Sequence, residues 1–124
     1  MAFNAKKHDA KAFTDGAWVN IMGGRFKVAR AGNLTYQEAL ERTRKRKFAT
    51  KAEEEEATLR AIAEGILKDW EDVEDADGKD IPYSIENAIT VMRENPDLLN
   101  DLLNEANSLD NYRRKDVEEQ AKKQ

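Results

Sequence analysis

The fold expected for this chain is decided by residues 16–30, which read Gly-Ala-Trp-Val-Asn-Ile-Met-Gly-Gly-Arg-Phe-Lys-Val-Ala-Arg. Aromatic and β-branched residues stand on both sides of a Gly-Gly pair, a favoured two-residue turn between antiparallel strands. Closing the turn at Gly23-Gly24 places Ile21 opposite Phe26. Because side chains alternate along a strand, one face of this hairpin then carries Val19, Ile21, Phe26 and Val28. A lone hairpin is only marginally stable in water, so we expect this face to pack against helices.

The longest helix is predicted at residues 51–71. Thr50-x-x-Glu53 is a capping box, in which the two side chains bind backbone N–H groups of the first helical turn. The apolar residues that follow recur at three- and four-residue steps and form one stripe: Leu59, Ile62, Ala63, Ile66, Leu67, Trp70 and Val73. A stripe of this kind has to be covered. We expect the apolar face of the hairpin to cover it.

Shorter helices are predicted on both sides of this one. Thr35-x-x-Glu38 predicts a helix over residues 36–47. Ser84 is the expected cap of a short helix, and Asn95-Pro96 is expected to end that helix and to begin the next. The expected fold class is therefore mainly α, a small helical domain with an N-terminal β-hairpin. The expected divisions of the chain are a mobile N-terminal segment at residues 1–12, a single domain at residues 13–112 with the hairpin at residues 17–30, and a polar C-terminal tail at residues 113–124.

Composition limits the classes of function that are open to the chain. Its 124 residues include no cysteine, which excludes disulfides, thiolate zinc sites and cysteine nucleophiles. The 21 basic and 25 acidic residues leave a net charge of −4, which argues against bulk attraction to nucleic acid or anionic membranes. No stretch approaches the ~18 apolar residues of a membrane span, and no signal-peptide pattern is present. We expect the protein to stay in the compartment where it is made.

No group of residues predicts catalysis, a metal site or a cofactor. An EF-hand aligned on Gly78 would place Val73 and Ser84 where carboxylates are required. We therefore interpret the acidic residues 72–82 as a solvated turn with Gly78 at positive φ. His8 is the only histidine. It lies in the segment expected to be mobile, where no neighbour would hold it as a base or ligand. We therefore expect a protein that is not an enzyme and that works by binding other proteins.

A basic run at residues 42–47, Arg-Thr-Arg-Lys-Arg-Lys, supports an alternative function. Such a run can bind phosphate groups, which would make the protein a small nucleic-acid-associated regulator. Base-stacking side chains would then be expected nearby, and only Tyr36 and Phe48 are available. The same run is also typical of a solvated helix end, where cations favour the negative pole of the helix dipole. A basic interface for an acidic protein is a third interpretation.

Two stretches of the chain carry a family resemblance. The first runs from Asp15-Gly16-Ala17-Trp18-Val19 through Gly24-Arg25-Phe26-Lys27-Val28-Ala29-Arg30 to Asn33 and Tyr36. The second is a Leu-x-x-Trp-x-x-Val pattern at residues 67–73, followed by an acidic turn and by Ile81-Pro82-Tyr83-Ser84 before a short helix. In this order, over about residues 13–105, the chain resembles the tail assembly chaperones of long-tailed bacteriophages.

The resemblance implies a non-enzymatic protein that coats the long tape measure protein, keeps it soluble and helps the tail tube protein polymerise around it. It implies a late protein of the host cytoplasm that is absent from the mature virion. It carries no cofactor and no catalytic residue. We also expect self-association, because the front of the chain is basic and its middle acidic, and we expect no membrane or nucleic-acid partner. The side chains that we predict to contact protein partners are Trp18, Met22, Trp70, Tyr83 and Tyr112.

Overall fold

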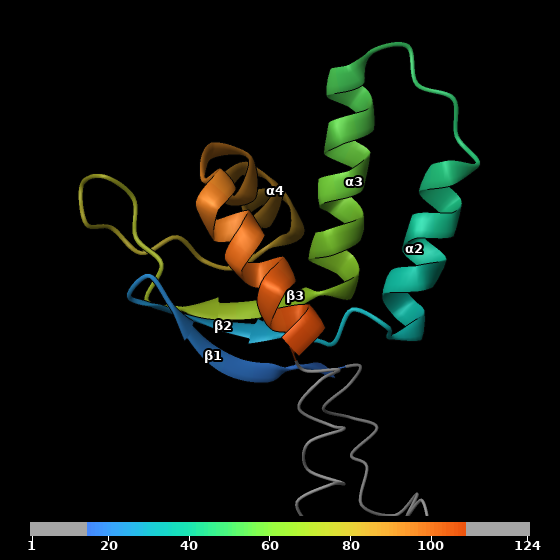
Figure 1. Cartoon of the computed structure of the whole chain (residues 1–124). Helices are drawn as coiled ribbons and strands as arrows, with labels where there is room; N and C mark the ends of the chain where they lie inside the picture. The colour runs from blue at the N-terminus through green and yellow to red at the C-terminus, as the bar shows by residue number, and fades with distance from the viewer. Residues whose placement is uncertain (1–14, 109–124) are drawn as a thin grey trace, which may run out of the picture.

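The computed structural model describes residues 15–108, in which three strands form an antiparallel sheet of order β1-β2-β3. In chain order the elements are β1 (Ala17–Ile21), β2 (Gly24–Val28), α2 (Leu34–Arg44), α3 (Lys51–Gly65), β3 (Leu67–Glu71) and α4 (Ile85–Glu94), followed by helical residues 96–108. Figure 1 shows α3, α4 and the last helical segment over one face of the sheet, with α2 beside α3. The predicted class, mainly α with a hairpin, is wrong, because the third strand makes this an α+β fold.

The hairpin predicted within residues 17–30 is present, but its turn lies one residue earlier than expected. The backbone φ angles are 51° at Met22 and 89° at Gly23, and a type I′ turn requires positive φ at both central residues. Ile21 therefore pairs with Gly24, and not with Phe26. The pairing differs by two positions, which is the period of a strand, so the predicted apolar face is unchanged. Gly24 is then the first residue of β2, and glycine suits this position because a Cβ atom there would lie 2.9 Å from the Phe26 ring.

The helix predicted at residues 51–71 ends at Gly65, and β3 takes up the rest of that range. Lys27 and Val28 are adjacent in β2 but pair with Asp69 and Leu67, so Lys68 is an extra residue in β3. This β-bulge turns Leu67 and Trp70 to the same face, although they are three positions apart. Both are buried, at 0% and 5% exposure. The spacing that predicted a helix is therefore produced by a bulged strand.

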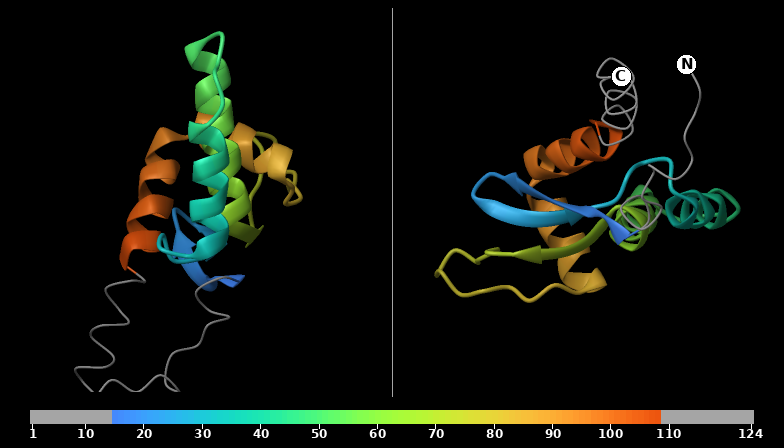
Figure 2. Two further views of the ribbon diagram at one scale, coloured as in Figure 1. Left: turned by 90° about the vertical axis from the view of Figure 1, so that its right-hand side faces the viewer. Right: turned by 90° about the horizontal axis from the view of Figure 1, so that it is seen from below.

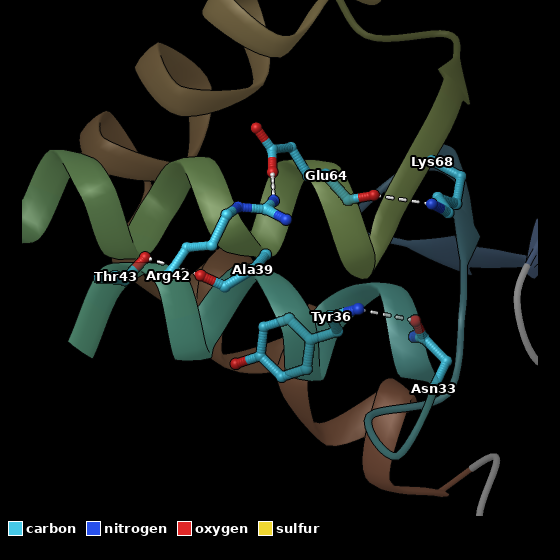
Figure 3. A network of polar contacts seen from close by, with 7 residues as sticks. All are labelled: Asn33, Tyr36, Ala39, Arg42, Thr43, Glu64 and Lys68. Atoms are coloured by element: carbon cyan, nitrogen blue, oxygen red, sulfur yellow. Dashed lines mark hydrogen bonds and ion pairs between the residues drawn. The ribbon is translucent and has the colours of Figure 1, made fainter. Parts of the chain in front are cut away.

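Asn33 joins the start of α2 to the end of α3. Its Oδ1 accepts a hydrogen bond from Tyr36 N at 2.9 Å, and its Nδ2 donates to the carbonyl of Gly65 at 2.9 Å. Figure 3 shows this cap and the neighbouring bonds along the α2–α3 contact. Asn33 and not Thr35 is thus the cap of α2, and the predicted start at residue 36 is wrong by two positions. The cap predicted at Thr50 for α3 is confirmed, since its hydroxyl accepts from Glu53 N at 3.2 Å.

The core lies between the sheet and the helices above it. Seen from below in Figure 2, the sheet lies across the helices, and α2 and α3 are viewed end-on. Ser84 caps α4 as predicted, and a new helical run follows Asn95. The largest side chains that are fully buried are Val28, Ile66, Leu67, Ile89, Met92 and Leu102. These come from the sheet, the end cap of α3 at Ile66, α4 and the last helical segment, so burial of apolar surface joins all of these elements. The expected segments at residues 1–12 and 113–124 lie outside the described residues.

Candidate functional site

A groove opens at the end of the sheet where β1 turns into β2. It has a volume of about 550 Å3 and lies between the hairpin tip, the loop after β3 and the junction of α4 with the last helical segment. We call it the tip groove. Its lining residues are Ile21, Met22, Gly24, Phe26, Asp72, Val73, Glu74, Asp75, Ala76, Ile81, Val91, Glu94, Asn95 and Leu98. A volume of this size is within the usual range for ligand and peptide sites.

The tip groove combines an apolar floor with an acidic rim. Its floor includes four side chains of the core cluster and two partly buried ones that pack against it, namely Ile21, Phe26, Val91 and Leu98 with Val73 and Ile81. At the rim, Asp72, Glu74 and Glu94 are exposed. Within residues 15–108 none of these three carboxylates forms an ion pair. The groove therefore offers apolar burial next to uncompensated negative charge.

The acidic wall of the groove is held by its own backbone bonds. Asp75 N donates to the carbonyl of Lys79 at 2.8 Å, and Ile81 N donates to the carbonyl of Val73 at 2.8 Å. The Asp75 carboxylate accepts from the backbone N–H groups of Asp77 at 2.9 Å and of Lys79 at 3.0 Å. Gly78 has φ 81°, the positive value predicted for it. The wall is therefore formed before any partner arrives, which lowers the entropy cost of binding.

Met22 is an exposed apolar side chain at the mouth of the tip groove. It is 71% exposed, and its φ of 51° places it in the left-handed region. For a residue with a Cβ atom this conformation costs about 1–2 kcal/mol. Asparagine or glycine would suit the turn better, so folding alone does not explain the methionine. Its flexible thioether side chain is well suited to contact irregular apolar surfaces.

The structure separates the residues that were predicted to contact partners. Met22 lines the tip groove. Trp18 is 37% exposed on the outer face of the sheet, where the guanidinium of Arg25 lies 5.0 Å from its ring centre. Trp70 is instead buried, and the partly buried Tyr83 packs against it, with ring centres 5.2 Å apart and nearly perpendicular planes. Tyr112 lies outside the described residues.

Hydrogen bonds explain why Trp70 and Tyr83 stand at these positions. Trp70 Nε1 donates to the carbonyl of Ile81 at 2.7 Å, which ties the acidic loop to the sheet. The Tyr83 hydroxyl lies 2.6 Å from the carbonyl of Leu67 and 3.1 Å from that of Ala63, where α3 passes into β3. The Trp and Pro-Tyr-Ser features that carried the family resemblance thus hold the wall of the groove in place. Val73 and Ile81 were not predicted as groove residues, because Val73 was placed on the apolar stripe of a helix and Ile81 in a solvated turn.

Tyr83 is expected to make the stability of the folded protein decrease at alkaline pH. Burial, and after it the negative charge of Asp69, raises the pKa of Tyr83 to about 12. The value in an unfolded chain is about 10. Because the folded state holds the proton more tightly, this contribution to stability is complete below about pH 10 and is lost as the pH rises towards 12. We expect the free energy of unfolding to fall by about 1–2 kcal/mol over that range, after allowance for solvent screening.

The measurement is urea unfolding from about pH 9 to about pH 12, compared with Tyr83→Phe. The variant should be about 1 kcal/mol less stable at neutral pH, because a hydrogen bond is lost, and its alkaline fall should be smaller. Tyr36, whose pKa is raised by burial, and Lys68, whose pKa is lowered by burial, titrate in both proteins. The difference between the two curves therefore reports Tyr83. Identical alkaline curves would contradict the assignment.

The basic run at residues 42–47 lies at the end of α2 and in the loop after it, and several of its side chains already have partners. Arg42 Nη2 lies 3.1 Å from Glu64 Oε2 of α3, as Figure 3 shows. The guanidinium of Arg46 lies 5.0 Å from the ring centre of Phe48. A base stacking on Phe48 would have to compete with this cation–π contact.

In the part of the chain that the structure describes, no cluster of three or more histidine, aspartate or glutamate side chains is arranged to hold a metal ion. Among the helices of residues 15–108, none combines the length and the apolar character that crossing a membrane requires.

Comparison with known proteins gives one match. A search of curated proteins and a search of solved structures find nothing similar to this chain. A family model described as YdaY prophage protein matches residues 25–123, which include all but the first residue of β2, the whole of β3 and every helix described above. The expected phage origin is thereby confirmed, at the level of a prophage family and without a stated role in tail assembly. Since the match covers most of the chain, the protein belongs to the YdaY prophage protein family.

Proposed function

We propose that this prophage protein is a non-enzymatic tail assembly chaperone that binds the tape measure protein of its phage, keeps it soluble and assists assembly of the tail tube. The observation that carries the proposal is Met22, an exposed and strained apolar residue at the mouth of a groove with an apolar floor and an acidic rim. Residues held in strained backbone conformations cluster at functional sites. The prophage family and the resemblance to tail assembly chaperones support the same reading.

The chemistry of the groove suits a helical client. Amphipathic helices bind apolar grooves through side chains at three- and four-residue spacing. A tape measure protein is long and helical, so a protein without turnover has to cover it with many copies. Weak individual contacts then suffice if neighbouring copies also touch, because adjacency raises the effective concentration. We further propose that the protein acts in the host cytoplasm, self-associates on its client and is left out of the mature virion.

The test is co-expression with the tape measure protein encoded by the same prophage. We expect the tape measure protein to remain soluble and to co-purify, with several copies of the chain per client by light scattering. Met22→Asn should reduce the amount of client retained several-fold. The same change should leave the fold intact or stabilise it by about 0.5–1 kcal/mol, since asparagine tolerates positive φ.

Leu34→Asn is the matched control. Leu34 is 68% exposed, similar to Met22, but it lies at the start of α2 and does not line the tip groove. Its replacement removes the same amount of exposed apolar surface, and client retention should be unchanged. Equal losses in the two variants would show that the groove has no special role. No retention of any tape measure fragment, together with tight and salt-dependent DNA binding, would favour the nucleic-acid regulator based on residues 42–47.

A further inference from the structure

We propose that the tip groove selects a helical segment of its partner in which apolar side chains are flanked by lysine or arginine. The inference rests on the protein-binding function and specifies the chemistry of the partner segment. The observation that supports the inference is the acidic rim, where Asp72, Glu74 and Glu94 surround the apolar floor. All three are exposed, and none forms an ion pair within residues 15–108.

The positions of the three carboxylates explain how the groove would select basic side chains. They come from two sides of the groove, Asp72 and Glu74 from the loop after β3 and Glu94 from the end of α4. A helix lying on the floor would present its flanking side chains to both sides. Basic side chains there meet complementary charge, whereas acidic ones meet like charge and are rejected. Each exposed pair contributes little alone, but the apolar contact places all of them together.

Asp75 has a different part in the same wall. Its carboxylate accepts two backbone hydrogen bonds within the loop, from Asp77 N and Lys79 N. Its removal would disturb the loop itself, so it is left unchanged in the test. Asp72 has φ 59°, a conformation that asparagine tolerates. Asp72→Asn, Glu74→Gln and Glu94→Gln therefore remove three charges and keep the shape of the groove.

The probes are two synthetic peptides about two heptads long. One carries leucine at three- and four-residue steps with lysine at the other positions, and the second carries glutamate in place of every lysine. Binding is measured by fluorescence anisotropy with the full chain, at low and at physiological salt. We expect the lysine peptide to bind at least about tenfold more tightly than the glutamate peptide, with a preference that shrinks as salt screens the charges.

The triple variant Asp72→Asn, Glu74→Gln, Glu94→Gln should weaken the lysine peptide about tenfold and abolish the preference. The matched control is Glu38→Gln, Glu54→Gln, Glu55→Gln. It changes the net charge equally at three exposed residues that do not line the groove. This control should bind both peptides as the parent does. Urea unfolding of both triple variants checks that neither has lost its fold.

The proposal would be overturned by equal binding of the two peptides, by tighter binding of the glutamate peptide, or by equal weakening in the control variant. A peptide of the chain's own residues 1–14, which contain Lys6, Lys7 and Lys11, is a competitor. If it binds the groove more tightly than the lysine peptide, the occupant is this chain and not a partner.

Retention of the tape measure protein by the triple variant at parental level would refute the partner chemistry alone. If the unmodified chain binds the lysine peptide but does not retain the tape measure protein, the chaperone function alone would be refuted.

Discussion

Gly65→Ala is expected to destabilise the protein by about 3 kcal/mol or more, although glycine to alanine within a helix ordinarily stabilises. A Cβ atom on Gly65 would collide with Tyr36 Cα and would lie 2.9 Å from Tyr36 N. These are backbone atoms, which cannot rotate away as a side chain can. The variant must therefore push α2 away from α3, and that shift would stretch the 2.9 Å bond from Asn33 Nδ2 to the Gly65 carbonyl.

Urea unfolding measures this effect, with Gly78→Ala as the control. Gly78 has φ 81°, but a Cβ atom there would come no closer than 3.9 Å to its nearest neighbour, Glu74 Oε2. Its replacement should cost only the backbone strain of about 1–2 kcal/mol. Unchanged or increased stability of Gly65→Ala would show that α2 does not pack this closely on α3.

Trp70→Ala is expected to cost about 3–5 kcal/mol, a large part of the stability of a small domain. Trp70 is 5% exposed and lies between Phe26 and Tyr83, with ring centres 6.4 Å and 5.2 Å away. Its replacement would leave a cavity and would remove the 2.7 Å hydrogen bond to the Ile81 carbonyl. Trp70→Phe keeps most of the ring and should lose less, which gives a graded variant if the alanine protein does not fold.

Trp18→Ala is the matched comparison, because Trp18 lies on the opposite face of the same sheet. At 37% exposure it should lose less than about 1 kcal/mol. Both tryptophans were predicted to contact partners, and urea unfolding of the two alanine variants distinguishes a core residue from a surface one. Equal losses would place Trp18 in a packed environment as well.

The error at β3 shows how far periodicity predicts a structure. Ile66, Leu67 and Trp70 continue a helical spacing that begins in α3, and no glycine or proline follows Gly65 to break it. The chain becomes a strand at that point because β2 offers an open edge, to which Leu67–Glu71 add through long-range hydrogen bonds. Local pattern carries no information about such a partner. The bulge at Lys68 then reproduces the three-residue spacing of a helix.

Short-range features were predicted more successfully. The caps at Thr50 and Ser84 and the positive φ of Gly78 depend on a few neighbouring residues, and each was found as predicted. The tip groove could be predicted only in part, through Met22. Its other walls come from segments far apart in the sequence, and they meet only because Trp70 and Tyr83 hold the acidic loop against the sheet.

The order of the strands has a consequence for synthesis of the protein on the ribosome. Arg25 of β2 bonds to Glu71 of β3, 46 positions later, and α2 and α3 lie between them. At about 5–20 residues per second, the hairpin is complete roughly 2–9 s before its third strand has been made. During that interval β2 has an open edge. Open edges pair readily with those of other chains, so neighbouring nascent chains on one messenger RNA are exposed to each other for as long as translation takes to reach Glu71.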